Sequence, residues 1–468
     1  MTAAPASPTS PANSPANSPA PSSSPDNLER ARAAFLQGVS HAEAGRWADA
    51  EAAFLEALQH APGRPSVLMN LGISRVHLGR FADAIAPLKA SAKADPAQAG
   101  VDTWAALATA QMETLAWADA ADSLEHALDV LAQPGAANAA QAQAAALPLR
   151  LQLSQCQSML GQHSRAIATL QQVIDVRPDH AEAWSRQGHL WRELENLDKA
   201  RHAYEQALKL GADPTLHRYY LAALNPASAV PDAPRAYVES LFDQYAADFE
   251  DHLVKQLGYQ GHRLLVEGLP ADVRATDAAD AAVVTAAGSP APHAGPRFRH
   301  ALDLGCGTGL CGPLIRPQAA QLTGVDVSAA MLEQARALGV YNALAHADIH
   351  DYLTALPPEP QFDLVLAADV FIYVGALDRV FTLLAPRLHP GAWFAFTVET
   401  TGGGSASTTG PEAELQLLPS LRYAHSLAYV DRLAEAHGLV RRHTAQAPLR
   451  VDQAEPLPGH FVYLHKPA

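Results

Sequence analysis

A glycine-rich run followed by a carboxylate is the part of this sequence best suited to bind a nucleoside. The run from Ala301 to Leu310 joins an apolar stretch to three alternating glycines, Gly305, Gly307 and Gly309, before a helix start. Glycines let the backbone turn tightly and approach a ligand closely, and the first turn of a helix offers free N–H groups. Asp326 ends the next apolar run, 21 residues after Gly305, where a carboxylate can accept both hydroxyls of a ribose.

Two residues near the glycines indicate which class of nucleoside the loop could bind. Leu310 occupies the position at which a dinucleotide fingerprint requires a third small residue. Asp303, two residues before the first glycine, would repel a pyrophosphate but could meet the amino group of a methionine moiety. The sequence also lacks a Gly-Lys-Ser or Gly-Lys-Thr run of the kind that binds nucleoside triphosphates. The spacing therefore disfavours a nicotinamide dinucleotide and a phosphate-binding loop.

Four stretches together resemble the motifs of class I S-adenosylmethionine-dependent methyltransferases. Leu302–Leu310 is similar to the first motif, and Gly324–Ser328 with Met331 is similar to the second. Ala347–Ile349 resembles the third motif, and Phe362–Phe371 resembles the fourth, a strand end that faces both the cofactor sulfur and the substrate. The resemblance implies a Rossmann-like seven-stranded α/β domain with S-adenosylmethionine as cofactor.

The resemblance also assigns roles to individual residues. In the family an acidic residue of the third motif meets the adenine amino group and its apolar neighbour packs on the ring, which gives these roles to Asp348 and Ile349. An acid after a strand is also often a helix cap, so that Asp348 has a second interpretation. The expected cofactor-binding residues are Asp303, Gly305, Gly307, Gly309, Asp326, Val327, Met331, Asp348, Ile349, Ala368 and Tyr245.

Tyr245 belongs to an aromatic and aliphatic stripe at helical spacing. The stripe consists of Tyr237, Leu241, Tyr245, Phe249 and Leu253, which recur on one helix face. Similar segments of related methyltransferases form a lid over the cofactor. The alternative is a helix that only packs on the domain.

The acceptor is expected beyond the carboxyl ends of the strands, where ligands of open parallel sheets gather. Asp369 ends the fourth strand, and Arg422 and His425 precede a late helix. We assign catalytic roles to Asp369 and His425, and substrate contacts to Tyr373 and Arg422. His425 is the candidate general base, because an imidazole titrates near working pH; the alternative is a structural or capping histidine.

From Arg299 onward short apolar runs alternate with helical ones, which predicts a parallel sheet with crossover helices. The expected strands are His300–Leu304, Gln321–Asp326, Asn342–Ala347, Phe362–Ala367, Ala392–Val398, Leu439–His443 and His460–His465.

An internal repeat precedes this domain. Five landmarks are matched 34 positions later by equivalent residues: Gly38, Ala50, Phe54, Ala57 and Pro62 by Gly72, Ala84, Leu88, Ser91 and Pro96. The period resembles the tetratricopeptide repeat, a pair of helices that stacks into a solenoid. About five copies fit between residues 27 and 213, and their concave face is expected to bind a protein or peptide partner; the alternative is a purely structural solenoid.

These features define the expected organisation. We predict a Pro-, Ser- and Ala-rich disordered tail at 1–26, an all-α repeat solenoid at 27–213, a linker at 214–235 and the methyltransferase domain at 236–468. Within that domain, lid helices are expected at 236–268 and a low-complexity insertion at 271–296.

Composition narrows the environment and the partners. The formal charge of −15 gives no broad attraction to nucleic acid or anionic lipid, and no long apolar run predicts a membrane span. Three cysteines are too few for a disulfide framework or a four-ligand zinc site. The cluster His346, Asp348, His350 and Asp351 does not converge four ligands by its spacing, so no metal is expected. We therefore expect a cytoplasmic protein.

The leading hypothesis is a methyltransferase whose solenoid recruits a protein substrate or partner. A small-molecule methyltransferase and a non-catalytic scaffold with an idle methyltransferase fold are the alternatives.

Overall fold

The computed structural model describes residues 25–94, 99–133, 138–225, 232–245, 258–270, 296–400, 414–452 and 455–468. The predicted tail up to residue 24, residues 226–231 of the predicted linker, residues 246–257 of the predicted lid and residues 271–295 of the predicted insertion lie outside these ranges. Contacts divide the chain into two compact units, with the division between Leu194 and Glu195. Each unit is described separately.

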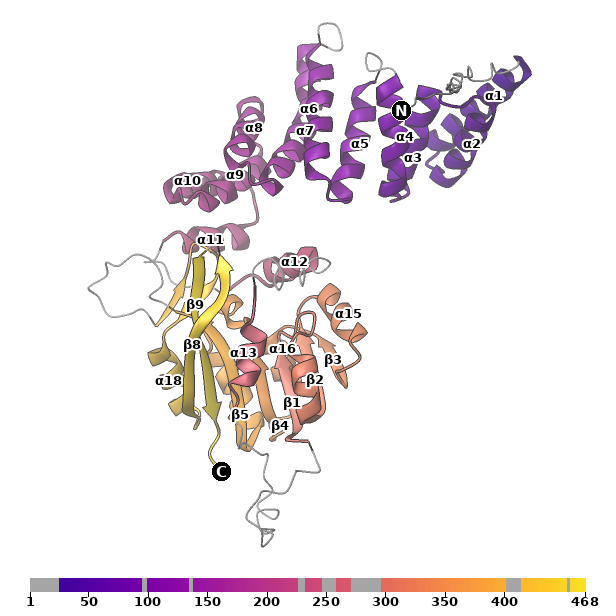
Figure 1. Cartoon of the computed structure of the whole chain (residues 1–468). Coiled ribbons are helices and arrows are strands. Elements are labelled where there is room, and N and C mark those ends of the chain that lie inside the picture. Colours follow the sequence, from indigo (N-terminus) through magenta and orange to yellow (C-terminus); the bar gives the residue numbers. More distant parts are fainter. Residues whose placement is uncertain are drawn as a thin grey trace, which may run out of the picture. The chain divides into compact units, whose positions relative to one another are not determined.

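The first unit is a stack of antiparallel helices, each packed on its neighbour in sequence (Figure 1). Its helices are α1 (Pro25–Glu43), α2 (Trp47–His60), α3 (Pro65–His77), α4 (Phe81–Ala94), α5 (Val101–Glu113), α6 (Trp117–Ala132), α7 (Ala139–Met159), α8 (His163–Val176) and α9 (Ala181–Glu193). The predicted all-α repeat architecture is confirmed.

The landmarks of the repeat are explained by close packing within each helix pair. A Cβ atom built on Gly38 would lie 2.5 Å from the ring of Phe54, and one on Gly72 would lie 2.4 Å from Leu88. Phe54 and Leu88 are fully buried. A side chain at either glycine would therefore push the paired helices apart, which is why small residues recur with the period.

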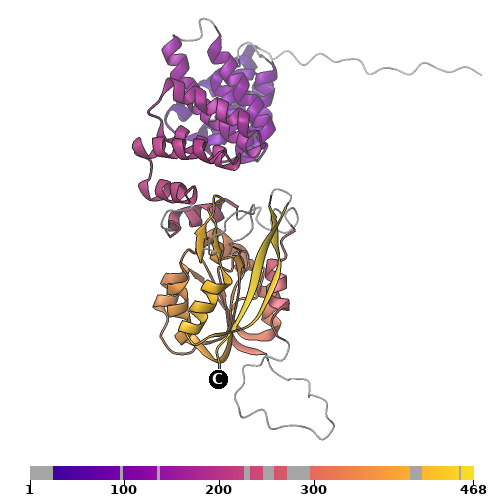
Figure 2. The same ribbon diagram turned by 90° about the vertical axis from the view of Figure 1, so that its left-hand side faces the viewer.

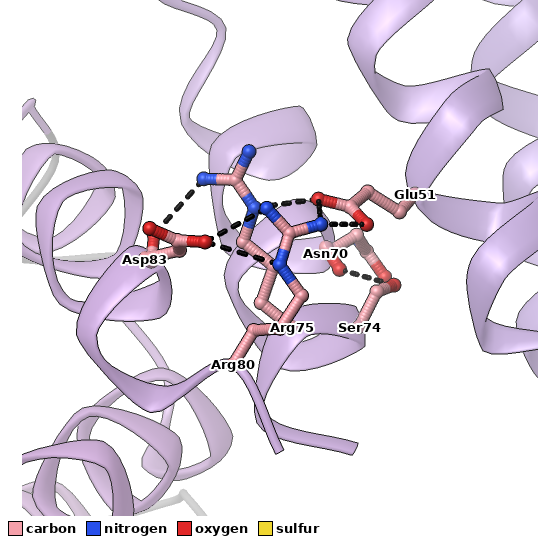
Figure 3. A network of polar contacts seen from close by, with 6 residues as sticks. All are labelled: Glu51, Asn70, Ser74, Arg75, Arg80 and Asp83. Atoms are coloured by element: carbon pink, nitrogen blue, oxygen red, sulfur yellow. Dashed lines mark hydrogen bonds and ion pairs between the residues drawn. The ribbon is translucent and has the colours of Figure 1, made fainter. Parts of the chain in front are cut away.

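One buried acid departs from the repeat pattern. Glu51 on α2 accepts hydrogen bonds from Arg75 Nε at 2.8 Å and from Arg80 Nη1 at 2.8 Å, and Arg80 also bonds Asp83 of α4 (Figure 3). The residue 34 positions later is Ile85. The network thus replaces an apolar contact between the first two repeats with a charged one.

The second unit begins with four helices: α10 (Leu197–Lys209), α11 (Pro214–Ala223), α12 (Arg235–Tyr245) and α13 (Gly261–Glu267). Helix α11 occupies the first part of the predicted linker at 214–235, so that part of the prediction is wrong. The helix forms because His217, Tyr219 and Tyr220 bury one face, and because Asp213 caps its first turn by accepting from the amide of Leu216 at 2.7 Å.

The sheet of this unit carries all seven predicted strands. They are β1 (Phe298–Leu304), β2 (Ala319–Asp326), β3 (Ala343–His346), β4 (Phe362–Ala367), β5 (Leu388–Glu399), β8 (Val440–Asp452) and β9 (Glu455–His465). Their order is β3-β2-β1-β4-β5-β9-β8. Strands β1 to β5 are parallel, β9 is antiparallel to β5, and β8 is antiparallel to β9, so that β8 runs in the same direction as β5. This confirms the predicted Rossmann-like fold.

A short hairpin was not predicted. Strands β6 (Leu415–Leu417) and β7 (Tyr423–His425) pair with each other, and β7 joins β5 at Glu399. Three-residue strands are too short for alternation to be read from sequence. The hairpin extends the sheet at the carboxyl end of β5.

Helices cover both faces of the sheet (Figure 2). They are α14 (Gly312–Ile315), α15 (Ala329–Ala337), α16 (Ile349–Ala355), α17 (Asp378–Leu384) and α18 (Leu427–Ala436), besides α13. Neighbouring residues of β4 enter opposite cores: Val365 packs in the core with α17 and α18, while Leu364 and Leu366 pack in the core with α13 and α14. Because β1 to β5 are parallel, their carboxyl ends lie at one common edge of the sheet. Within the described ranges, no helix is long and apolar enough to span a bilayer.

Candidate functional site

A cavity of about 630 Å³ lies beyond the carboxyl ends of the parallel strands in the second unit. It takes residues from the loops after β1, β2, β3 and β4, from α12 and from the β6–β7 turn. The predicted site residues that line it are Asp303, Gly305, Gly307, Asp326, Val327, Asp348, Ile349, Ala368, Asp369, Tyr373 and Arg422.

The glycine loop after β1 adopts a backbone that only glycine follows without strain. Gly305, Gly307 and Gly309 have φ values of +65°, +54° and +94°. A Cβ on Gly305 would lie 2.5 Å from Val370, and one on Gly309 would lie 2.9 Å from Leu338. A Cβ on Gly307 would meet no atom within 4 Å. Gly309 does not line the cavity; it supports the loop from behind, whereas Gly307 leaves open space for a ligand.

Asp326 is oriented by backbone donors on both carboxylate oxygens. Its Oδ2 accepts from the amide of Gly307 at 2.8 Å, and its Oδ1 accepts from the amide of Ser328 at 2.9 Å. Burial raises the pKa of this carboxyl, and the two amides oppose that shift. Each oxygen keeps further acceptor capacity, so the carboxylate is held where both hydroxyls of a ribose can bond it.

Asp303 lies in the floor of the cavity, 1% exposed, and accepts a hydrogen bond of 2.7 Å from the hydroxyl of Tyr341. Burial raises the pKa of Asp303 to about 7. A ligand ammonium group would favour the ionised carboxylate. Tyr341 was not predicted, because it follows α15 outside every motif.

A second residue that was not predicted, Thr308, lies in the glycine loop after β1. Thr308 is 1% exposed and lines the cavity, and its hydroxyl has no hydrogen-bond partner among the described residues. Buried hydroxyls are normally paired. An orphaned donor beside a loop that leaves room at Gly307 fits a ligand with an oxygen acceptor, such as the carboxylate of an amino acid.

Both interpretations of Asp348 are supported. Its Oδ1 accepts from the amide of His350 at 2.7 Å, which makes it the cap of α16, and the His350 side chain lowers its pKa. The residue also lines the cavity next to Ile349. Capping by one oxygen leaves acceptor capacity for a ligand amino group.

The side of the cavity that we predict to bind the acceptor contains three predicted residues. Asp369 has a φ of +58°, which is unusual for a residue other than glycine, and its amide donates to Thr397 Oγ1 at 2.7 Å. The ring of Tyr373 contacts that of Phe242 edge-on, with centroids 5.1 Å apart. Arg422 enters from the β6–β7 turn. Arg379, at the start of α17, also lines the cavity and was missed.

Helix α12 contributes Tyr237, Val238, Leu241 and Phe242 to the lining. The hydroxyl of Ser328 donates to Asp243 of α12 at 2.5 Å, which connects this helix to the loop after β2. Tyr245 is the last residue of α12, but its side chain lies outside the described residues.

Two predicted residues are placed away from the cavity. Met331 is fully buried in α15, where its amide bonds the Ser328 cap. His425 is 0% exposed, and its Nε2 contacts the carbonyl oxygen of Gly375 at 2.8 Å. Burial lowers the pKa of His425 to about 4. This imidazole is poorly placed to act as a general base, because it does not line the cavity and its lowered pKa makes it a weak proton acceptor.

Across the described residues, no group of three or more histidines, cysteines or carboxylates is arranged to hold a metal ion. Cys306 and Cys311 line the cavity, and burial raises the pKa of both thiols well above the ordinary value. They therefore stay protonated and are not activated nucleophiles.

Comparisons with known proteins agree with this geometry. A family model described as a methyltransferase domain matches residues 302–394, and one described as a tetratricopeptide repeat matches residues 26–65, 35–99 and 160–217. Human methyltransferase-like protein 27 is 33% identical over 221 residues, which cover 45% of this chain and 78% of that protein.

Two bacterial relatives are matched over a smaller part of their length. The ubiquinone biosynthesis O-methyltransferase of Thiobacillus denitrificans is 30% identical over 32% of this chain and 65% of its own length. The malonyl-[acyl-carrier protein] O-methyltransferase of Legionella pneumophila is 31% identical over 30% of this chain and 47% of its own.

Two solved structures also match part of the chain. A crystal structure of MamA matches at 20% identity and a TM-score of 0.34, covering 39% of this chain and 92% of that one. YrrB, described as a TPR protein with an unusual peptide-binding site, matches at 18% identity and a TM-score of 0.36, covering 42% and 93%.

Proposed function

Because the chain belongs to the methyltransferase family, with tetratricopeptide repeats ahead of its methyltransferase domain, we propose that it methylates an acceptor held at the Asp369 side of the cavity, with the repeats binding a protein substrate or partner. The observation that carries the catalytic part is Asp326, whose two oxygens are oriented by the amides of Gly307 and Ser328 at the cavity wall.

The residues on the glycine side of the cavity fit the cofactor S-adenosylmethionine. Asp326 would accept the ribose hydroxyls and Asp303 would pair with the ammonium group. Thr308 would donate to the carboxylate, while Ile349 would pack on the adenine. When bound, this cofactor supplies a methyl group on a positively charged sulfur.

Beyond binding the cofactor, the protein contributes to the reaction by positioning the acceptor. Helix α12 excludes water from one side of the cavity, and Tyr373 and Arg422 orient the acceptor. Where the acceptor carries a proton, Asp369 is the carboxylate at the end of β4 that would take it, since His425 is enclosed. Orientation therefore contributes more to the rate than acid–base chemistry.

The repeats support a protein acceptor or partner, because stacked helix pairs commonly present a concave surface to a peptide or protein. A second candidate is a small-molecule acceptor. It is favoured by the relative from Thiobacillus denitrificans, whose name describes O-methylation in ubiquinone biosynthesis.

The first test is isothermal titration of the full chain with S-adenosylmethionine and S-adenosylhomocysteine, using reduced nicotinamide cofactor as a control. Micromolar binding of the adenosyl compounds alone supports the catalytic proposal. Absence of binding would favour the idle fold.

The acceptor class is then decided with S-adenosylmethionine carrying a tritiated methyl group, incubated with cell extract. If the label stays with the macromolecular fraction and is released from it only by protease treatment, the acceptor is a protein. Label that passes a low-mass filter without protease indicates a small molecule. An Asp326→Ala chain is the matched control for background labelling.

A further inference from the structure

The acceptor side of the cavity depends on a short turn that a distant helix holds in place. Residues Leu418–Arg422 connect β6 to β7, and Ser420 and Arg422 of this turn line the cavity. The amide of Leu421 donates to the carbonyl oxygen of Leu418 at 2.9 Å, and the amide of Leu418 donates to the carbonyl oxygen of Arg422 at 2.8 Å. Leu421 has a φ of +65°, a conformation that costs a leucine free energy and persists only where its surroundings enforce it.

Tyr219 of α11 supplies that enforcement. Its hydroxyl donates to the carbonyl oxygen of Leu421 at 2.7 Å, across 202 residues of sequence. Tyr219 is 1% exposed, so the bond is made away from water, where losing it leaves a buried carbonyl unpaired. Burial raises the pKa of the Tyr219 hydroxyl above its ordinary value, which keeps it a donor.

The ring of Tyr219 makes further contacts on the acceptor side. Its centroid lies 5.6 Å from that of Tyr237, which lines the cavity from α12, and 6.3 Å from that of Tyr423 in β7. A Cβ built on Gly375, another lining residue, would lie 3.3 Å from the Tyr423 ring. The rings of Tyr219 and Tyr423 therefore pack directly against the cavity-lining residues Tyr237 and Gly375.

Helix α11 is in turn fixed by α10. The Tyr220 ring lies 5.1 Å from that of Tyr204 on α10, and Arg201 of α10 donates to the carbonyl oxygen of Leu224 at 3.1 Å. The tetratricopeptide match extends to residue 217, so α10 belongs to the repeat by sequence and to the methyltransferase unit by its contacts. A helix of the repeat type thus supports the acceptor wall through α11.

We propose that Tyr219 is a positioning residue for the acceptor, which fixes the β6–β7 turn so that Ser420 and Arg422 face the cavity. The proposal rests on the proposed methyltransferase function. Its consequence is that α10 and α11 shape acceptor recognition, whereas the cofactor side, built on Asp303 and Asp326, is independent of them.

The test uses the full chain with Tyr219→Phe, which keeps the ring and removes the hydroxyl. Tyr352→Phe is the matched control: it removes the same hydroxyl from a half-buried tyrosine of α16. In Tyr219→Phe we expect hydrogen exchange at the amides of Leu418 and Leu421 to accelerate about tenfold, since one buried hydrogen bond is lost. S-adenosylhomocysteine affinity should stay within about twofold of wild type.

Transfer of labelled methyl groups to desalted cell extract supplies the kinetic readout. For Tyr219→Phe the amount of extract that gives half-maximal rate should rise about fivefold to tenfold, with the maximal rate little changed. A parallel loss of S-adenosylhomocysteine affinity would overturn the proposal, because it would indicate a general structural role. Unchanged exchange of the turn would also overturn it. If wild type binds no S-adenosylhomocysteine, the proposed function fails, and the exchange result still decides whether Tyr219 fixes the turn.

Discussion

The hydroxyl of Tyr341 donates a 2.7 Å hydrogen bond to Oδ2 of Asp303 in the floor of the cavity. This bond partly offsets the burial that raises the pKa of the carboxyl. Tyr341→Phe should therefore raise that pKa further and leave less carboxylate to meet a ligand ammonium group. We expect S-adenosylhomocysteine to bind about fivefold to tenfold more weakly at pH 7 and with a smaller deficit at pH 9, as measured by calorimetry. An equal deficit at both pH values would contradict this explanation.

The pH dependence of cofactor binding follows from the same carboxyl. Asp303 has a pKa of about 7 in the free protein, and an ammonium group would bind its ionised form. Affinity should therefore level off above about pH 8 and fall as the pH drops below about 7, by up to about tenfold per pH unit. Titrations at pH 6 in two buffers of different ionisation enthalpy should show release of a proton on binding. Asp303→Asn should remove this pH dependence.

The same pKa predicts how the free protein responds to pH. Because the carboxyl pKa is raised from its ordinary value of 3.8, the folded protein binds more protons than the unfolded chain between about pH 4 and 7. The contribution of Asp303 to stability should therefore fall as the pH rises through that window. Comparison of thermal unfolding with Asp303→Asn across pH 5 to 8 measures this effect.

Asp326→Ala should weaken adenosyl binding by about a hundredfold or more, since it removes the acceptor for both ribose hydroxyls and the partner of the Gly307 amide. Calorimetry with S-adenosylhomocysteine measures the loss. Glu333→Ala, at an exposed acid of α15, should bind as wild type does. Unchanged affinity in Asp326→Ala would remove the ribose assignment.

His425→Gln should lower the stability of the protein but should not alter the pH dependence of methyl transfer. The imidazole bonds the carbonyl oxygen of Gly375 and is fully buried. We therefore expect the free energy of unfolding of the variant to fall by about 1–3 kcal/mol, measured by thermal unfolding. Its pH–rate profile for methyl transfer should keep the inflections of wild type. Loss of one inflection in the variant would restore His425 as a base.

His425 also makes a signed contribution to stability. Its pKa is lowered from 6.5 to about 4, so the unfolded chain takes up a proton first as the solution is acidified. The contribution of His425 to the free energy of unfolding should therefore be fully present above about pH 6.5. It should be lost progressively as the pH falls to about 4.

Glu51→Gln should destabilise the first unit, because the half-buried Arg75 then loses its buried charge partner. We expect a loss of about 1–3 kcal/mol, measured by denaturant unfolding monitored by circular dichroism. Asp83→Ala removes a more exposed partner of Arg80 and should cost less, about 0–1 kcal/mol. A cost for Asp83→Ala as large as that for Glu51→Gln would contradict the distinction between buried and exposed pairs.

The glycine loop and carboxylate of the candidate cofactor site could be placed from the sequence because they are local in the chain. Gly305 and Gly307 must sit in the turn after β1, and Asp326 must end the adjacent strand, whatever the rest of the chain does. The repeat was equally readable, because Gly38 and Phe54 meet within one helix pair and their spacing recurs. Short-range geometry turns sequence spacing directly into position.

Motifs and spacing therefore predicted the succession of a helical repeat and a Rossmann-like methyltransferase domain, together with the glycine loop and its carboxylate. Long-range packing, in contrast, brings Tyr341 to Asp303, places Tyr219 against the turn at Leu421 and encloses His425. It also turned part of the predicted linker into α11, whose tyrosines find partners in distant segments. These outcomes depend on which side chains far apart in the chain share one buried space, and neither periodicity nor motif spacing encodes that pairing.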